Sequence, residues 1–166
     1  LQFPVKAPSG TKKPHFFRGD SSNQVNLWMW NADMAEGGGN GAVDANARGW
    51  RQQPKVQKED QQQIVSKANW DQGQWTMVMK RPLKTDDKND VQFEAGIFIP
   101  MAMNAWDGSN GEHGVIMSLS SWHYVFIEAP MPITVYIFTA LGFILTGGVL
   151  VWFARKVEAK PESEAT

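Results

Sequence analysis

A long alternation of apolar and polar residues runs through residues 91–105 and predicts a β-strand. Its apolar members have odd numbers and share one face: Val91, Phe93, Ala95, Ile97, Ile99, Met101, Met103 and Ala105. The turn-forming residues 107–111 follow, and Val115, Met117 and Leu119 then form the apolar face of a second strand. The pattern predicts a long hairpin, whose apolar face must be covered by another layer.

Two further segments alternate in the same way. In the strand predicted over residues 24–30, Val25, Leu27 and Met29 face one way, and Asn26, Trp28 and Trp30 face the other. A second strand is predicted over residues 75–81. Several strands with turn signals and little helix predict an all-β fold, an antiparallel β-sandwich over residues 20–129. Residues 1–19 are expected to form an extended arm, and residues 35–69 a polar insertion within the domain.

The pattern changes after residue 130, where the chain becomes continuously apolar. Residues 133–154 contain no charged side chain and would extend about 33 Å as a helix, enough to cross a bilayer. We therefore expect one transmembrane helix within residues 130–154. Arg155 and Lys156 follow it, which predicts a cytoplasmic tail over residues 155–166 and a periplasmic β-domain. Gly142 and Thr146 have the spacing of a helix-packing pair, so other transmembrane helices are possible partners.

Composition narrows the possible functions. The net charge is −1, so the chain lacks the basic field that a nucleic acid would need. The sequence contains no cysteine, which excludes disulfides, iron–sulfur ligation and covalent haem attachment within this chain. The chain begins at Leu1 rather than Met, so we expect that a further segment precedes it.

No pattern of catalytic residues is present. The histidines His15, His113 and His123 form no metal-binding motif, and structural or exposed roles are expected for them. Acidic pairs such as Asp86-Asp87 lie in polar runs typical of solvated surface. We therefore expect a non-catalytic protein.

Two methionines are the exception. Met29 and Met117 each lie on the apolar face of a predicted strand, so their thioethers could point into one cavity between two sheets. A flat apolar ligand with soft axial donors would be a haem. Periodicity alone favours the alternative that both side chains are core packing.

Several motifs resemble those of the ethylbenzene dehydrogenase haem-binding family. They are Arg18-Gly-Asp20 followed by the strand through Leu27-Trp-Met-Trp30, the segment 74–83 ending in Lys-Arg-Pro-Leu, the segment 99–108 ending in Trp-Asp-Gly, and the strand ending Ser121-Trp122. The resemblance covers roughly residues 13–127 in the same order. The family includes γ subunits of periplasmic molybdenum enzymes of the dimethyl sulfoxide reductase superfamily, nitrite-oxidising relatives among them.

The resemblance implies a β-sandwich that holds one non-covalent haem b between a Met and a Lys. The Met ligand falls on Met29, with Met34 second. The Lys is expected just before Ser118, where this chain has Met117, and no Lys occurs between Lys88 and Lys156. This departure favours a bis-Met haem, with His113 as the alternative second ligand. Candidates for the pocket walls or its far face are Trp28, Trp30, Met101 and Met103.

The implied function is electron transfer as a membrane-anchored b-type cytochrome subunit. Its implied partners are a molybdenum-cofactor catalytic subunit, an iron–sulfur subunit, and a membrane or periplasmic electron carrier. One rival is a haem-less subunit that anchors the same complex, favoured by the absent Lys. Another is a tethered module that binds carbohydrate or protein through exposed tryptophans such as Trp70, Trp75 or Trp106.

Overall fold

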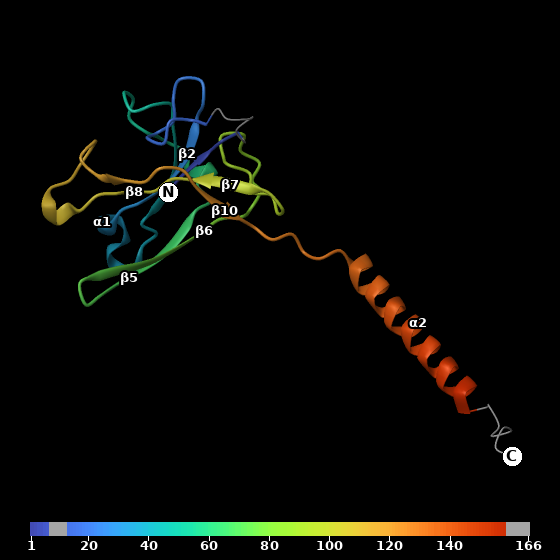
Figure 1. Ribbon diagram of the computed structural model, residues 1–166. Coiled ribbons are helices and arrows are strands. Elements are labelled where there is room, and N and C mark those ends of the chain that lie inside the picture. The colour runs from blue at the N-terminus through green and yellow to red at the C-terminus, as the bar shows by residue number, and fades with distance from the viewer. Residues whose placement is uncertain (7–12, 159–166) are drawn as a thin grey trace, which may run out of the picture. The chain divides into compact units, whose positions relative to one another are not determined.

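The computed structural model describes residues 1–6 and 13–158, and antiparallel strands dominate its larger unit (Figure 1). The largest sheet has the order β1-β2-β3-β4, formed by Gln2–Pro4, Val25–Trp30, Ala42–Ala47 and Lys55–Val56. β2 and β3 pair along their whole length, from Val25 opposite Ala47 to Trp30 opposite Ala42. The strand predicted over residues 24–30 is confirmed, and it lies inside the sheet.

Three two-stranded sheets complete the unit. They are β5 (Val65–Asp71) with β6 (Gln74–Lys80), β7 (Phe98–Met101) with β10 (His123–Phe126), and β8 (Asn104–Ala105) with β9 (Ser118–Leu119). Gln72 and Gly73 join β5 to β6 with φ of 48° and 80°, as a two-residue type I′ turn requires. The short helical segments are α1 (Ala32–Ala35), η1 (Glu36–Gly38), η2 (Glu59–Gln61) and η3 (Gly108–Asn110).

The alternation of β2 divides the apolar interior into two clusters. The main core lies on the Trp28 face and consists of Phe3, Trp28, Ala42, Ile64, Val91, Phe93 and Ile99. The second cluster lies on the opposite face and consists of Val25, Leu27, Ala45 and Ala47, with Met29 and Trp122 packed at its margin. Since Ile99 of β7 packs on the Trp28 face of the main sheet, two β-layers enclose the main core. The predicted all-β, antiparallel sandwich class is confirmed.

The predicted long hairpin forms, but with shorter strands and an irregularity. Residues 91–97 are not a strand, although Val91 and Phe93 are buried, and Gly96 turns the chain with φ of 84°. Met101 pairs with His123, and Asn104 pairs with Leu119. Asn104 is therefore three residues after Met101, whereas His123 is four residues after Leu119. This one-residue shift is a β-bulge, and it divides the hairpin into the β7–β10 and β8–β9 sheets.

Two expected segment boundaries differ from the structure. Residues 35–69 do not form a separate insertion, because they include β3, whose Ala42, Ala45 and Ala47 are buried in the sheet. The arm expected over residues 1–19 contributes β1, which pairs with β2 and carries the buried Phe3. Alanine and asparagine are weak strand formers, so β3 is formed by its neighbours rather than by its own propensity.

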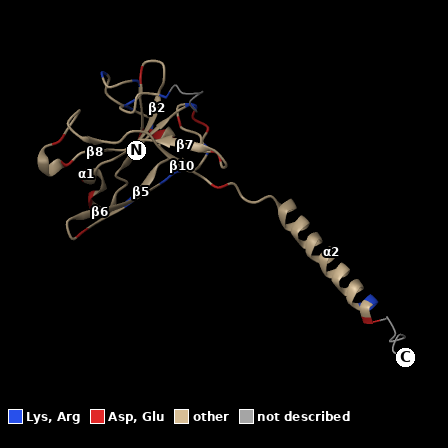
Figure 2. Ribbon diagram, viewed as in Figure 1, with Lys and Arg blue, Asp and Glu red and all other residues tan. Residues whose placement is uncertain are grey.

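The second unit, residues 129–166, contains helix α2, Ile133–Glu158. Within the described residues it is the one helix long and apolar enough to cross a membrane, with mean hydropathy 2.1 over its most apolar window. Figure 2 shows that its charges gather at the C-terminal end, where Arg155 and Lys156 occupy the last turn. The helix extends past the predicted end at residue 154 and ends at Glu158. The part of the predicted tail beyond residue 158 lies outside the described residues.

A buried ion network joins the strands of the first unit. The Arg81 guanidinium lies 3.3 Å from carboxylate oxygens of both Asp44 and Asp90, and all three side chains are fully buried. Arg81 Nη1 also donates to Asn26 Oδ1 at 3.1 Å, and the guanidinium lies 5.0 Å from the Trp28 ring. Burial raises the pKa of the Asp44 carboxyl to about 6; the hydrogen bond from Asn26 opposes the shift, and repulsion from Asp90 adds to it.

This shift makes the free energy of unfolding depend on pH. Because Asp44 binds its proton more tightly in the folded chain (pKa about 6) than in the unfolded chain (about 3.9), its stabilising contribution is complete below about pH 4. That contribution, of the order of 3 kcal/mol, is lost as the pH rises through about 6. Denaturant unfolding between pH 4 and 7 should show this loss in the wild type. It should be absent in Asp44→Asn and retained in the exposed control Asp86→Asn, and an unchanged slope in Asp44→Asn would contradict the assignment.

Candidate functional site

The first predicted ligand, Met29, lies near the C-terminal end of β2. Its side chain is half-buried and packs at the margin of the second cluster, as does Trp122. Trp28 and Trp30 lie on the opposite face of the strand, in and against the main core. The structure therefore does not bring Met29 together with these two tryptophans.

The second predicted ligand, Met117, directly precedes β9. Continuing the alternation of β9 places Met117 on the face of Leu119, which pairs with Asn104 on β8. Trp106 continues the same face of β8. Leu119 and Trp106 are 44% and 39% exposed, and Met117 is half-buried. Met117 thus belongs to an apolar, solvent-accessible hairpin face, which we call the Met117 face (Met117, Leu119, Trp106 and Asn104).

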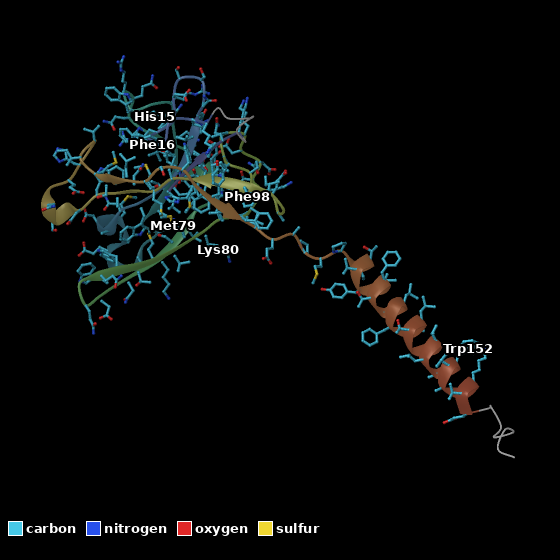
Figure 3. All side chains as sticks on the ribbon, in the orientation of Figure 1. His15, Phe16, Met79, Lys80, Phe98 and Trp152 are labelled. Atoms are coloured by element: carbon cyan, nitrogen blue, oxygen red, sulfur yellow. The ribbon has the colours of Figure 1, made fainter. Side chains whose placement is uncertain are left out.

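The β5–β6 hairpin has an apolar face of its own. Trp70 is directly opposite Trp75, and Ala68 is opposite Met77, so these residues share one side. Met79 continues this side into the main core, while its neighbour Lys80 is exposed (Figure 3). Three residues beyond the core remain open to solvent: Trp70 at 55%, Trp75 at 44% and Met77 at 39%. In Figure 1 this hairpin and β8–β9 extend toward the same side of the view.

Trp30 connects the β5–β6 face to the main sheet. Its ring lies edge-on to Trp75 at 5.1 Å, and Trp75 lies 5.3 Å from Trp70. The indole Nε1 of Trp30 is buried and has no hydrogen-bond partner among the described residues. A buried N–H normally has a partner, so this indole is an exception among the described residues.

Gly41 fixes the position of this indole. A β-carbon at residue 41 would lie 2.7 Å from both Trp30 Nε1 and Ala35 Cβ, and 2.8 Å from the Asn31 carbonyl oxygen. Gly41→Ala is expected to lower the free energy of unfolding by about 1–3 kcal/mol because these atoms must move apart. Denaturant unfolding in detergent measures the change. Gly108→Ala is the matched control, since its β-carbon would meet nothing within 4 Å, and an equal loss in both variants would contradict the packing argument.

The remaining candidates are dispersed. His113 is exposed, and its Nδ1 lies 2.7 Å from the Gly111 carbonyl oxygen, which holds the ring against its own turn. Met34, on α1, is 51% exposed. Met101 packs against the main core, whereas Met103 is 45% exposed and lies on the side of β8 opposite the Met117 face. Among the described residues no three His, Asp or Glu side chains form a metal-binding group.

Two surface clefts, of about 490 and 340 Å³, share Gln24, Arg48 and Asn89 in their walls. They lie beside the start of β2, whereas Met29 lies near its end. Their walls mix polar and apolar groups, and neither contains a predicted ligand. Sequence reasoning also missed the Asp44–Arg81–Asp90 network, because its members are far apart in the chain and only the fold brings them together.

Comparisons with known proteins bear on these residues. The family model described as ethylbenzene dehydrogenase matches residues 48–118, which end at the Met117 face. A protein of Haloferax mediterranei described as a respiratory nitrate reductase heme subunit is 31% identical over 154 residues, covering 91% of this chain and 51% of the relative. No solved structure matches the chain significantly.

Two further relatives are described as γ subunits. The chlorate reductase subunit gamma of Ideonella dechloratans is 28% identical, over 68% of this chain and 42% of the relative. The dimethylsulfide dehydrogenase subunit gamma of Rhodovulum sulfidophilum is 27% identical, over 68% and 43%. The chain therefore spans about half the length, or somewhat less, of the curated relatives it matches. The family model and these relatives agree with one another and with the motifs in the sequence, and the chain is similar to the ethylbenzene dehydrogenase family over residues 48–118.

Proposed function

We propose that this chain is the haem-b electron-transfer subunit of a membrane-anchored oxidoreductase complex. The observation that carries the proposal is the Met117 face, a solvent-accessible apolar surface with a thioether on it, in a chain similar to a described heme subunit. The chain supplies binding and orientation and performs no bond chemistry itself. A haem bound here would supply one-electron transfer.

The residues present fit a non-covalent porphyrin. Two separate faces carry large apolar side chains of the kind that cover a flat ligand: Leu119 and Trp106 on the Met117 face, and Trp70, Trp75 and Met77 on the β5–β6 face. Since the chain has no cysteine, covalent attachment through thioether links is excluded.

We propose that Met29 and Met117 would hold the haem iron through their thioethers. Both side chains are half-buried, so each has some surface that a bound group could contact. The alternatives are Met34 for the first position and His113 for the second. In this proposal Trp28, Trp30 and Met101 remain in or against the main core, on the side of β2 opposite Met29. Two neutral thioethers favour ferrous iron and should raise the reduction potential relative to a nitrogen ligand.

The relatives described as γ subunits support the same assembly for this chain. Its partners would be a molybdenum-cofactor subunit and an iron–sulfur subunit, with electrons passing to or from a membrane or periplasmic carrier. Helix α2 would anchor the chain with Arg155 and Lys156 on the cytoplasmic side and the β-unit in the periplasm.

The test is an optical spectrum of the full chain extracted in detergent from its native membrane, first oxidised and then reduced. The proposal predicts a low-spin b-type spectrum and a haem that acid extraction removes completely. A colourless chain that still co-purifies with its large partners would overturn the electron-transfer role and favour a haem-less anchoring subunit.

A second candidate function rests on the exposed pair Trp70 and Trp75. Two tilted indoles 5.3 Å apart on a strand surface are also typical of a carbohydrate-binding platform. Sugar-dependent thermal stabilisation of the colourless chain, lost in Trp70→Ala, would favour that function. The absence of any shift would dismiss it.

A further inference from the structure

The β7–β10 sheet carries an aromatic surface that the proposed haem site does not use. Phe98 pairs with Phe126 and Pro100 pairs with Tyr124, so these four residues share one face of the sheet. Ile99 and Met101 lie on the other face, against the main core. We define the aromatic patch as Phe98, Tyr124 and Phe126.

The aromatic patch is open to solvent. Phe98 is 68% exposed, Tyr124 49% and Phe126 47%. The Phe98 ring, labelled on β7 in Figure 3, lies 4.9 Å from the Phe126 ring and 6.4 Å from the Tyr124 ring. Three contiguous aromatic rings are an unusual exposure for the surface of a folded domain, and such patches mark interaction sites.

The chemistry of the aromatic patch fits a membrane interface. Aromatic rings with a polar tip, such as Tyr124, are favoured at the headgroup level of a bilayer. Lys13 Nζ lies 4.8 Å from the Tyr124 ring, which places a cation beside the patch where anionic headgroups would attract it.

Chain connectivity selects the bilayer over a protein partner. The aromatic patch ends at Phe126, and α2 begins at Ile133. The intervening residues 127–132 extend at most about 20 Å, and Pro130 and Pro132 restrict their conformations. The patch is therefore covalently held near the surface of any bilayer that α2 crosses.

We propose that the aromatic patch inserts into the headgroup region of the bilayer that α2 spans, giving the β-unit a second attachment to the membrane. The inference rests on the membrane anchoring in the proposed function and is independent of haem binding. In this proposal the aromatic patch and the adjacent lysine contact the lipid headgroups, in addition to the apolar helix.

Spin labelling tests the proposal, because the chain contains no cysteine and each introduced cysteine is unique. The full chain is placed in nanodiscs of phosphatidylethanolamine and phosphatidylglycerol, with nitroxides attached to Phe98→Cys and, separately, Phe126→Cys. Collisions with oxygen report lipid, and collisions with a water-soluble nickel chelate report solvent. The ratio of oxygen to nickel accessibility should be several-fold higher at both sites than at the control Thr76→Cys, which is exposed on β6.

Two additional labels separate the possible failures. Leu145→Cys, in the middle of α2, should report lipid whether or not the patch is inserted. A lipid signal at residue 145 with a water signal at residues 98 and 126 would overturn the docking proposal and leave the anchor intact. Water signals at all three positions would overturn the anchor itself.

A variant tests whether the rings cause the insertion. In the Phe126→Cys chain, adding Phe98→Ser and Tyr124→Ser should return the label to a solvent signal. If the patch labels become protected only when purified partner subunits are added, the patch is a protein interface and the proposal is wrong.

Discussion

Replacing Arg81 with leucine is expected to lower the free energy of unfolding by about 3–5 kcal/mol. The substitution leaves the Asp44 and Asp90 carboxylates buried with no cation beside them, and it also removes the donor to Asn26 Oδ1. Thr85 Oγ1 and Gln57 Nε2 still donate to Asp90, at 2.7 and 2.8 Å, but neutral donors do not replace a guanidinium. The main core should loosen, because Arg81 also stacks over Trp28.

Denaturant unfolding in detergent, followed by tryptophan fluorescence, measures this loss. The matched control is Lys80→Leu, the neighbouring cation on β6, which is exposed and should change the free energy by less than about 0.5 kcal/mol. Adding Asp44→Asn to Arg81→Leu should recover part of the stability. A loss no larger than that of the control would show that the network does not stabilise the fold.

Replacing Met117 with alanine is expected to convert the haem from low-spin to high-spin, because one axial thioether is removed. Replacing it with lysine should instead keep a low-spin spectrum with a shifted Soret band and a lower reduction potential, since a nitrogen donor stabilises ferric iron more than a thioether does. The lysine variant restores the donor that the family resemblance predicts at this position. Spectra of the purified full chains measure both effects.

Met103→Ala is the matched control for these variants. Met103 lies on the opposite side of β8 from the Met117 face and is exposed, so its loss should leave the spectrum unchanged. A comparison of Met34→Ala with Met29→Ala identifies the other methionine ligand. Only Met29→Ala should disturb the spectrum. If Met117→Ala retained a native low-spin spectrum while His113→Ala did not, His113 would be the second ligand.

The parts of the fold that the sequence predicts are those with strong periodicity. Strands β2 and β6 are short apolar runs rich in Trp, Met and Val, and α2 is a long apolar run, so all three were predictable. β3, with sequence Ala-Val-Asp-Ala-Asn-Ala, has little strand propensity and is formed by pairing with β2. Residues 91–97 differ in the opposite way, because their alternation predicted a strand that the structure does not contain. Val91 and Phe93 are buried, but this segment pairs with no strand.

The candidate site was predictable only in part. The alternation correctly separates Met29 from Trp28 and Trp30, but it cannot say which face meets which layer. The β-bulge between Met101 and Asn104 sets the register of β8–β9 and therefore determines which residues form the Met117 face. No residue type in the sequence predicts this bulge. The pair Asp86-Asp87 was expected at a solvated surface, yet Asp87 is buried and accepts a hydrogen bond from the Asn89 backbone N–H. Asp90, three residues on, is also buried and pairs with Arg81.

The central claim is that this chain holds a haem between two thioethers, and near-infrared magnetic circular dichroism of the oxidised full chain tests it most directly. The charge-transfer band in that region depends on the two axial donors. We predict the band of bis-thioether ligation, lost in Met29→Ala and in Met117→Ala and unchanged in Met103→Ala. A band typical of a nitrogen ligand that survives both substitutions, or a chain without haem, would contradict the account.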